Sequence, residues 1–370
     1  MPDVSIVIPT HNRHEELART LRDIGRLRGL GSVEVVIVDN ASDIRVETPG
    51  TLENGVRVRT IHSDRNMGAA GRNLGAQEAW AEWLLMLDDD SAPVDASFLE
   101  AACEAGEDVA AVGGRIDLPD GTRERGGLPE VIVGCGALVR RSDFLDSGGY
   151  DEAFGYYAEE YDLCAKLLLS GRRIAYDERL RVLHRKVTGG RDMNEILRRI
   201  TRNSAWVELR YAPDHLRDEM VEHIVLRYGA IASKEGAGSG YERGVAELAS
   251  TYDRQRRTPM DEALYDRFTG LAHARAGVHA ARGRLAGRRV ALVGAGKQAW
   301  AVERALAELS LCGAGCELVR SPERAEVLVV GTLSPGPMFD ALAAHTSSGK
   351  VVIAPWSPGL ASMERSSMAA

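Results

Sequence analysis

Three consecutive carboxylates, Asp88 to Asp90, directly follow the apolar run Trp83–Leu87, and Pro93 closes the segment. Like charges at the end of a buried strand repel one another and are costly to remove from water. A divalent cation reverses that cost, because Mg²⁺ and Mn²⁺ prefer oxygen ligands. Alternate side chains of an extended segment point to one side, so Asp88 and Asp90 can share a site. The triplet predicts a metal site, and the alternative is a solvated acidic turn.

A glycine-rich stretch, Asn66 to Ala76, offers a second kind of chemistry. Gly68 and Gly71 stand near the predicted start of a helix, where backbone amides and the helix N-terminus favour anions such as a diphosphate. Arg72 adds a charge-assisted donor for phosphate or ribose. The alternative is a helix of small residues packed tightly on a sheet, with Arg72 in solvent. Asn73 is expected to brace the loop.

Strand and helix signals alternate along the first 190 residues. The pattern predicts buried strands at Val4–Ile8, Val33–Val38 and Trp83–Leu87, a more exposed strand at Val56–Ile61, and helices at Glu15–Arg28, Ala69–Glu82 and Ile196–Tyr211. Such alternation favours an α/β fold with a parallel sheet and helices on both faces. Ligands bind these sheets at the carboxyl ends of the strands, and Asp39 and the aspartate triplet both fall there.

Five segments occur in an order that resembles family 2 glycosyltransferases of the GT-A fold, a Rossmann-like, mostly parallel α/β architecture. They are VSIVIPTHNR (Val4–Arg13), VVIVDNAS (Val35–Ser42), the glycine-rich stretch, the aspartate triplet and Gly148–Tyr176. The resemblance covers roughly residues 1–211. It implies an inverting transfer of a hexose or deoxyhexose to an acceptor hydroxyl, with Mg²⁺ or Mn²⁺ bound. The implied donor is a sugar nucleotide carrying UDP, dTDP or GDP.

The resemblance also implies roles for individual residues. The implied donor-binding residues are Pro9, Thr10, Asn12, Arg13, Asp39, Asn66, Gly68, Arg72, Asp88 and Asp89. The implied metal ligands are Asp90, which is the best candidate, Asp88 and His184. Asp88 or Asp89 would reach the ribose or a metal-bound water. Two alternatives stay open: Asp39 as a turn aspartate or helix N-cap, and His184 as a structural histidine.

The implied catalytic base falls in the segment YYAEEYDLC. The family's pattern runs glycine, Glu, Asp, any residue, Asp, Leu, whereas this chain has Ala158, Glu159, Glu160, Tyr161, Asp162 and Leu163. The second acidic position is therefore Glu160, and a glutamate remains a competent base when burial raises its pKa. Glu159 and Asp162 are the other candidates for the base. An acid-rich first turn of a helix is the structural alternative.

Beyond residue 211 the chain changes character. Residues 212–287 are predicted to be helical, with a flexible segment at Gly236–Gly240, and residues 288–370 to form a small Rossmann-like domain. Gly294, Gly296 and Ala299 follow a strand with the spacing of a dinucleotide-binding loop. Glu317 is near the position of a ribose-binding acid but starts the next strand. The pattern permits NAD(P) and favours an accessory module for packing, oligomers or partner contact.

Composition sets outer limits on the function. The chain has 370 residues, 44% of them hydrophobic, and a net charge of −8, as in a soluble globular protein that does not bind nucleic acid through its phosphates. Five scattered cysteines predict reduced thiols and a cytoplasmic location. No apolar run reaches the ~18 residues of a membrane helix, which favours a soluble small-molecule or glycan acceptor.

Two other functions remain open at this point. The chain could be a non-catalytic GT-A scaffold that binds a nucleotide sugar and serves as a partner protein, an alternative that the glutamate at position 160 favours. It could also be a bifunctional enzyme whose C-terminal domain binds a nicotinamide cofactor. A homo-oligomer is compatible with each reading.

Overall fold

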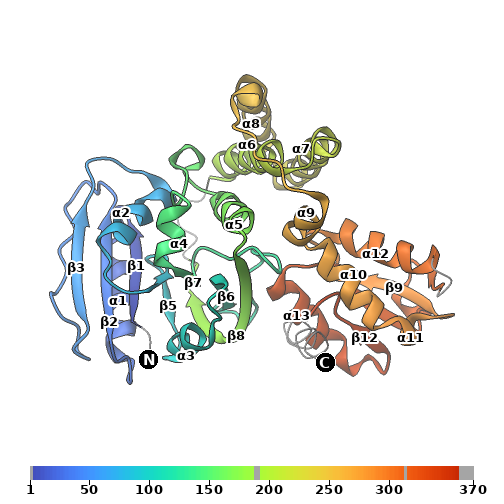
Figure 1. Ribbon diagram of the computed structural model, residues 1–370, viewed down its shortest axis with the longest axis horizontal. Helices are drawn as coiled ribbons and strands as arrows, with labels where there is room; N and C mark the ends of the chain where they lie inside the picture. The colour runs from blue at the N-terminus through green and yellow to red at the C-terminus, as the bar shows by residue number, and fades with distance from the viewer. Residues whose placement is uncertain (1–2, 187–191, 312–314, 358–370) are drawn as a thin grey trace.

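The structure, a computed structural model, describes residues 3–186, 192–311 and 315–357. Within these ranges an eight-stranded sheet forms from the first half of the chain, and a four-stranded sheet forms near its C-terminus. Helices lie between the two sheets, and one group of helices stands above them in the view of Figure 1. The α/β class expected from the sequence is confirmed.

The larger sheet is mostly parallel. Its strands are β1 (Val4–Thr10), β2 (Val33–Asp39), β3 (Arg57–His62), β4 (Trp83–Met86), β5 (Ser91–Pro93), β6 (Val109–Asp117), β7 (Ala137–Arg140) and β8 (Arg173–His184). Their order is β3-β2-β1-β4-β7-β6-β8-β5, with β5 and β7 antiparallel to their neighbours. Every residue of β1 and β2 is buried, as expected for parallel strands covered on both faces.

Helices of the first half pack on this sheet. They are α1 (His14–Arg26), α2 (Gly71–Glu78), α3 (Ser97–Glu104), α4 (Arg141–Asp146) and α5 (Glu159–Leu169). The predicted apolar stripe of α1 is buried at Leu17, Leu21 and Ile24.

The predicted helix over 69–82 ends earlier, at Glu78. The amide of Trp80 donates to the buried Glu34 carboxylate at 3.1 Å, and the amide of Ala81 to Ser5 Oγ at 3.3 Å. Side chains of β1 and β2 thus satisfy these amides outside a helix, so the chain is already extended where β4 begins at Trp83.

The predicted rim of the sheet is present. Thr10 of β1 pairs with Asp39 of β2, and Asp39 pairs with His62 of β3. The amide of Leu87, just after β4, donates to the carbonyl of Val7 at 3.1 Å. Parallel pairing therefore brings the residues that follow β1, β2 and β4 to one edge.

The middle of the chain is helical. Its helices are α6 (Met193–Tyr211), α7 (Arg217–Glu235), α8 (Gly238–Thr251), α9 (Glu262–Thr269), α10 (Leu271–Ala280) and α11 (Arg282–Leu285). The prediction of a flexible segment at Gly236–Gly240 was wrong, because α8 already begins at Gly238. A Cβ at Gly240 would overlap the carbonyl oxygen of Asn194, so this glycine lets α8 pack closely on α6. Across the described ranges, no helix has both the length and the apolar character needed to span a bilayer.

The smaller sheet is parallel throughout. Its strands are β9 (Arg289–Val293), β10 (Glu317–Leu318), β11 (Val327–Val330) and β12 (Val351–Ile353), in the order β10-β9-β11-β12, with helices α12 (Ala299–Leu311) and α13 (Pro335–His345). Residues after its strands contact the first half of the chain. Ser334 Oγ donates to the Gly126 carbonyl at 2.6 Å. The ring of Trp356 lies edge-on to that of Tyr176, with the ring centroids 5.8 Å apart. One hydrophobic core extends across both regions, and the division into 1–211, 212–287 and 288–370 stays a prediction.

A buried pair joins α6 to α9. The hydroxyl of Tyr265 donates to Oε2 of Glu208 at 2.6 Å. Burial raises the pKa of Glu208 from 4.5 to about 7, against the lowering effect of this hydrogen bond. The folded chain therefore binds this proton more tightly than the unfolded chain does. The contribution of this proton to the free energy of unfolding is fully present below pH 4.5, the pKa of Glu208 in the unfolded chain. It is lost as the pH rises through about 7, the pKa in the folded chain.

We expect Glu208→Gln to remove this dependence, because glutamine keeps an acceptor for Tyr265 without a charge. The free energy of unfolding should change by less than about 1 kcal/mol near pH 5 and rise by about 2–3 kcal/mol near pH 8. Urea unfolding at the two pH values measures both changes. The exposed Glu47→Gln serves as the control, and an equal effect of Glu208→Gln at both pH values would contradict the assignment.

Candidate functional site

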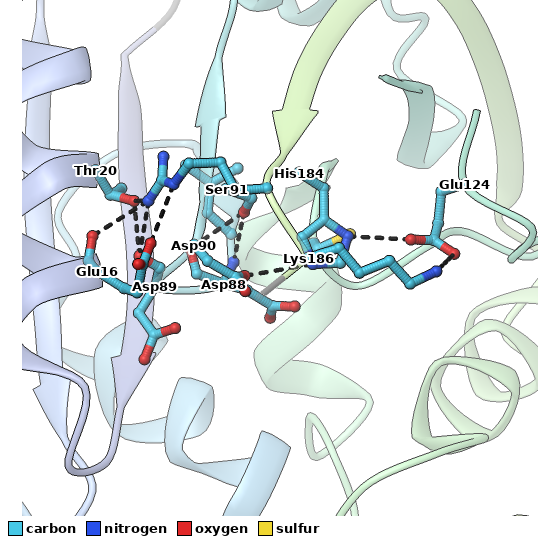
Figure 2. A network of polar contacts seen from close by, with 12 residues as sticks. Glu16, Thr20, Asp88, Asp89, Asp90, Ser91, Glu124, His184 and Lys186 are labelled. Atoms are coloured by element: carbon cyan, nitrogen blue, oxygen red, sulfur yellow. Dashed lines mark hydrogen bonds and ion pairs between the residues drawn. The ribbon is translucent and has the colours of Figure 1, made fainter. Parts of the chain in front are cut away.

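The aspartate triplet lies directly after β4, beside the end of β1 (Figure 2). Asp89 and Asp90 are buried, whereas the side chain of Asp88 is 41% exposed. Thr10 Oγ1 donates to Asp89 at 2.9 Å. Arg13 pairs with Asp89 at 3.1 Å and with Asp90 at 2.7 Å. The end of β1 and the loop after it therefore partly neutralise the buried part of the triplet.

The two buried carboxyls differ in their proton affinity. Burial raises the pKa of Asp89 to about 7, and Arg13 and Thr10 only partly oppose this. Burial acts on Asp90 in the same direction, but hydrogen bonds from His184 and Arg13 hold the pKa of that carboxyl well below its usual range. Asp90 is thus the member of the buried pair that stays ionised.

His184 ends β8, where antiparallel pairing sets it opposite Ser91. Its Nε2 lies 3.3 Å from Asp90 Oδ1, and its Nδ1 lies 3.1 Å from Glu124 and 3.6 Å from Cys135 Sγ. Burial lowers the pKa of His184, but these partners together raise it to about 12. Figure 2 shows the resulting row of contacts from the aspartates through His184 to Glu124.

The donor atoms at this point fit a divalent cation. Ligand atoms of Asp88, Cys135 and His184 all lie within 4.8 Å of one another, and Asp90 adjoins them through His184. Carboxylate oxygen and imidazole nitrogen suit Mn²⁺ and Mg²⁺. Burial raises the pKa of the Cys135 thiol to about 11, so Cys135 is a neutral neighbour of His184. Sequence analysis singled out the aspartates and His184 but missed Cys135 and Glu124.

The glycine-rich stretch is held by a close approach of two loops. Gly68 has a φ of 61°, and a Cβ there would overlap the carbonyl oxygen of Gly155. Asn40, buried after β2, donates to the Gly68 carbonyl and accepts from the Met67 amide, each at 2.9 Å. Asn66 Oδ1 accepts from the Gly68 amide at 2.9 Å. Position 68 thus requires glycine for backbone conformation and for space.

Arg72 is buried rather than solvated. It forms an ion pair with Asp88 and donates to the Leu87 carbonyl at 2.9 Å. Its Nε makes no hydrogen bond within the described residues. Asn73 braces a loop other than the expected glycine-rich one: its side-chain amide accepts from the Tyr150 amide at 2.9 Å and donates to the Tyr150 carbonyl at 2.8 Å. Helix α2 thereby positions both Asp88 and the loop at Tyr150.

Asp39 uses both carboxylate oxygens within the protein. They accept from the amides of Ser42 and Val46 at 3.0 and 3.1 Å, and His62 Nδ1 lies 3.0 Å away. Burial raises the pKa of Asp39, but these hydrogen bonds lower it to about 2. Asp39 therefore orders the turn after β2, and its contact with a nucleotide base stays a prediction.

The loops after β1 and β2 are tied together at Asn12. Its side chain accepts from the Asp43 amide at 2.8 Å and donates to the Asp43 carboxylate at 3.0 Å, and its own amide donates to Ser42 Oγ at 3.0 Å. Pro9 and Thr10 lie in the last two positions of β1. Pro9, Thr10 and Asn12, which were predicted to bind the donor, therefore lie at this corner of the rim.

The acidic segment begins α5 on an unusual backbone. Tyr157 and Ala158 have φ values of 74° and 66°, in the left-handed region that favours glycine. Asn203 of α6 donates from Nδ2 to the carbonyls of Phe154, Tyr156 and Tyr157 at 2.8–2.9 Å. This buried amide holds the turn that presents the acids. Sequence analysis missed Asn203, whose only signal was an asparagine within an amphipathic helix.

The three candidate bases have different surroundings. Asp162 is buried, accepts from the Tyr211 hydroxyl at 2.7 Å, and pairs with Arg210 and Lys166 at 2.8 and 2.9 Å. Its charge therefore serves the contacts between α5 and α6.

Glu160 is partly exposed, and its Oε1 accepts from the Gly134 amide at 3.3 Å. Glu159 is buried, and its Oε2 has no hydrogen-bond partner in the part of the chain that the structure describes. Burial raises the pKa of both glutamates, and in Glu159 the neighbouring charge of Glu160 raises it further.

The glycine loop after β9 is contacted on one side by residues that follow β11. A Cβ at Gly296 would lie 3.0 Å from Thr332 Oγ1, and Thr332 and Leu333 donate to the Lys297 carbonyl at 3.2 and 3.1 Å. Residues that follow β11 therefore lie close to one side of the loop, while Gly294 and Gly296 are exposed. Glu317 is exposed at the start of β10 rather than at its end, so it does not take the usual place of a ribose-binding acid. Binding of NAD(P) stays a prediction.

Comparisons with known proteins show which proteins the first half of the chain is similar to. Residues 5–155 match the family model "Glycosyl transferase family 2". The "Pre-mycofactocin glycosyltransferase" of Mycobacterium tuberculosis is 31% identical over 216 residues, with 51% of this chain and 44% of that protein covered. An "Uncharacterized glycosyltransferase" of Haemophilus influenzae is 30% identical over 185 residues, with 45% and 62% covered. The chain spans about half the length of these curated relatives.

Solved structures with a similar arrangement share little sequence. S. aureus TarS 1-349 in complex with UDP-GlcNAc has a TM-score of 0.49 and 15% identity, with 85% of this chain and 92% of that chain covered. The mannosyltransferase PcManGT from Pyrobaculum calidifontis, in complex with GDP-Man and Mn²⁺, has a TM-score of 0.44 and 16% identity, with 68% and 77% covered.

The sheet order and the acidic triplet after β4 agree with the GT-A fold that the sequence resemblance implied. The family match is confined to residues 5–155, and it supports the resemblance of the N-terminal region to glycosyl transferase family 2.

We expect Gly68→Ala to disturb the donor-side loop. The new methyl group would overlap Gly155, and the alanine would be held in a left-handed backbone conformation. Together these two effects should lower the free energy of unfolding by about 2–4 kcal/mol. Urea unfolding measures the loss. Gly50→Ala is the matched control, because a Cβ at Gly50 meets no atom within 4 Å. Equal stability of the two variants would contradict the close approach of these loops.

Proposed function

We propose that this chain transfers a sugar from a nucleoside-diphosphate sugar to an acceptor hydroxyl, with a divalent cation and with inversion at the anomeric carbon. The observation that carries the proposal is a short line of contacts between the two acidic groups. Arg72 pairs with Asp88 and lies 3.5 Å from the Gly134 carbonyl, while the Gly134 amide donates to Glu160. A donor-side carboxylate and a candidate base are thus separated by one arginine and one glycine.

The donor side is proposed to lie along the rim of the larger sheet. The base would sit at the corner formed by the loops after β1 and β2, where Asn12 links the two. The diphosphate would lie between the triplet and the segment Gly68–Arg72, where backbone amides at the start of α2 favour anions. UDP, dTDP and GDP are the proposed carriers.

Asp88 and Asp90, together with His184 once its imidazole has released the proton that Asp90 and Glu124 stabilise, would hold Mg²⁺ or Mn²⁺. When bound, the cation would stabilise the negative charge of a departing diphosphate. The neighbouring Arg72 adds positive charge on the same side through its contact with Asp88. Arg13 supplies one positive charge for the two buried carboxyls Asp89 and Asp90, so part of their negative charge is left for a bound cation.

Glu160 is the proposed general base. When two carboxyls lie side by side, one of them retains its proton, because like charges disfavour the second ionisation. Glu159 is buried, whereas Glu160 is partly exposed and its carboxylate accepts from the Gly134 amide, so we assign Glu160 as the group that accepts the proton of an acceptor hydroxyl. Direct attack through an oxocarbenium-like transition state then inverts the anomeric centre.

The second half of the chain is proposed to serve as an accessory module in this reaction. Glu317 stands at the start of β10 rather than at its end, where a ribose-binding acid is expected, so we propose no nicotinamide chemistry for this region. Its contacts with the first half, such as Ser334 with Gly126, favour a role in shaping the acceptor side. A small molecule or glycan with a free hydroxyl is the proposed acceptor.

Thermal shifts with UDP, GDP, dTDP and CDP, each with and without Mn²⁺, test the proposal. We expect one diphosphate to stabilise the chain only in the presence of metal, because the cation offsets the repulsion between the diphosphate and the carboxylates of the triplet. Asp90→Ala should abolish this shift. If no nucleotide gives a metal-linked shift, the catalytic proposal fails and a non-catalytic scaffold is favoured.

Substitution of the acids on α5 tests the base. Glu160→Gln should lower kcat by about 10²–10⁴-fold, because it removes proton transfer while leaving size and donor contacts unchanged. Glu159→Gln is the matched control and should lower kcat less than about tenfold, since Glu159 is buried and is not the proposed proton acceptor. Release of nucleoside diphosphate from the donor measures the rate. Unchanged turnover in Glu160→Gln would exclude it as the base.

A further inference from the structure

Residues 122–127 form a segment after β6 that we call the strap. The strap folds back on the end of β6, where the Glu124 amide donates to the Ile116 carbonyl at 2.9 Å. Both oxygens of its Glu124 carboxylate have partners: Oε2 lies 3.1 Å from His184 Nδ1, and Oε1 accepts from Lys186 Nζ at 3.0 Å. Figure 2 shows Glu124 meeting His184 on the side away from the aspartates. The strap therefore contacts the candidate metal site through one carboxylate.

Helix α13 packs against the backbone of the strap. A Cβ at Gly336, the second residue of α13, would lie 2.1 Å from the Glu124 carbonyl oxygen and 2.9 Å from the Arg123 Cβ. Because backbone cannot rotate away as the end of a side chain can, position 336 requires glycine for space. Ser334, just before the helix, donates from Oγ to the Gly126 carbonyl at 2.6 Å. The start of α13 thus holds the backbone of the strap in place.

Arg123 adds a second connection between the strap and α13. Its amide donates to Asp340 Oδ2 at 3.1 Å, and its guanidinium lies over the Phe339 ring, 5.0 Å from the centroid. The same guanidinium donates to both oxygens of Glu178 in β8, at 2.9 and 3.0 Å. Strand β8 ends at His184. The strap is therefore fixed both to α13 and to the strand that carries the candidate metal ligand.

The contact between Glu124 and His184 has the form of a carboxylate partner to a metal-binding histidine. A histidine that binds a metal usually donates its other ring N–H to a carboxylate, which fixes the orientation of the ring. His184 has this arrangement, because Nδ1 faces Glu124 while Nε2 lies 3.3 Å from Asp90 Oδ1 on the side of the triplet. Loss of such a partner weakens metal binding by about 10–100-fold. Glu124 therefore suits the role of a residue that orients a ligand without touching the metal.

We propose that Glu124 is a positioning residue for the metal site, and that α13 holds it against His184 through the close contact at Gly336. The inference rests on the proposed function, which assigns His184 to the metal. It gives the second half of the chain a specific role at that site. The link runs through two direct contacts, one from the helix to the backbone of the strap and one from the carboxylate of the strap to the imidazole.

The Mn²⁺ dependence of the thermal shift tests this role in the full chain. Mn²⁺ is titrated at a saturating concentration of the nucleoside diphosphate that stabilises the wild type, chosen from UDP, GDP, dTDP and CDP. Glu124→Ala should raise the Mn²⁺ concentration that gives half of the shift by about 10–100-fold. Glu124→Gln should raise it less, because glutamine keeps an acceptor for the Nδ1–H of His184. Gly336→Ala should also raise it. Gly283→Ala in α11, where a Cβ meets no atom within 4 Å, is the matched control and should behave as the wild type does.

Hydrogen–deuterium exchange in EDTA reports on the strap itself, without metal or nucleotide. Peptides that contain residues 122–127 should exchange faster in Gly336→Ala than in the wild type, because the strap amides lose the contacts that hold them. Asp340→Ala, which removes the acceptor of the Arg123 amide, should loosen the same segment without a steric clash. Gly283→Ala should leave the exchange unchanged. Circular dichroism checks that each variant is folded.

Three results would overturn the inference while leaving the proposed function intact. The first is an unchanged Mn²⁺ midpoint in Glu124→Ala, or an equal rise in Glu124→Ala and Glu124→Gln. The second is an unchanged midpoint in Gly336→Ala when its strap exchanges faster. The third is unchanged exchange of the strap in both Gly336→Ala and Asp340→Ala. A wild type without a metal-linked shift is a different result, because it contradicts the proposed function and removes the metal role of His184 with it.

Discussion

Burial of Asp89 and Asp90 at the end of β4 is the constraint around which this half of the molecule is arranged. Two buried carboxyls require positive partners, and the sheet brings them from distant parts of the sequence: Arg13 from the loop after β1 and His184 from the end of β8. The next residue, Arg185, donates to the Asp89 carbonyl and to Thr20 of α1. The same contacts that neutralise the charge therefore fix the loop after β4 between two layers.

Much of this arrangement follows from the sequence because it depends on local pattern. Continuous apolar runs place β1, β2 and β4, and parallel pairing then places Asp39 and the triplet on one rim. The early end of α2 does not follow from the pattern, because it depends on two buried side chains, Glu34 and Ser5, that satisfy amides far along the chain. Local helix propensity does not depend on partners so far away in the sequence.

The contributions of Cys135, Glu124 and Asn203 were beyond sequence reasoning for a related reason. Each acts through a neighbour that is remote in sequence: Cys135 and Glu124 through His184, and Asn203 through the carbonyls before α5. The glycine spacing at 294–299 shows the converse problem. A close approach to Thr332 requires the same small residue as a close approach to a pyrophosphate, so the pattern alone does not separate the two.

The central claim is that the charge at the triplet is arranged for a divalent cation next to a nucleotide. Binding of Mn²⁺, followed by the loss of its free-ion electron paramagnetic resonance signal with a nucleoside diphosphate present, tests this most directly. The account predicts one saturable site in the wild type, and its loss in Asp90→Asn with the fold retained by circular dichroism. Absence of a saturable site, or an equal site in Asp90→Asn, would contradict the account.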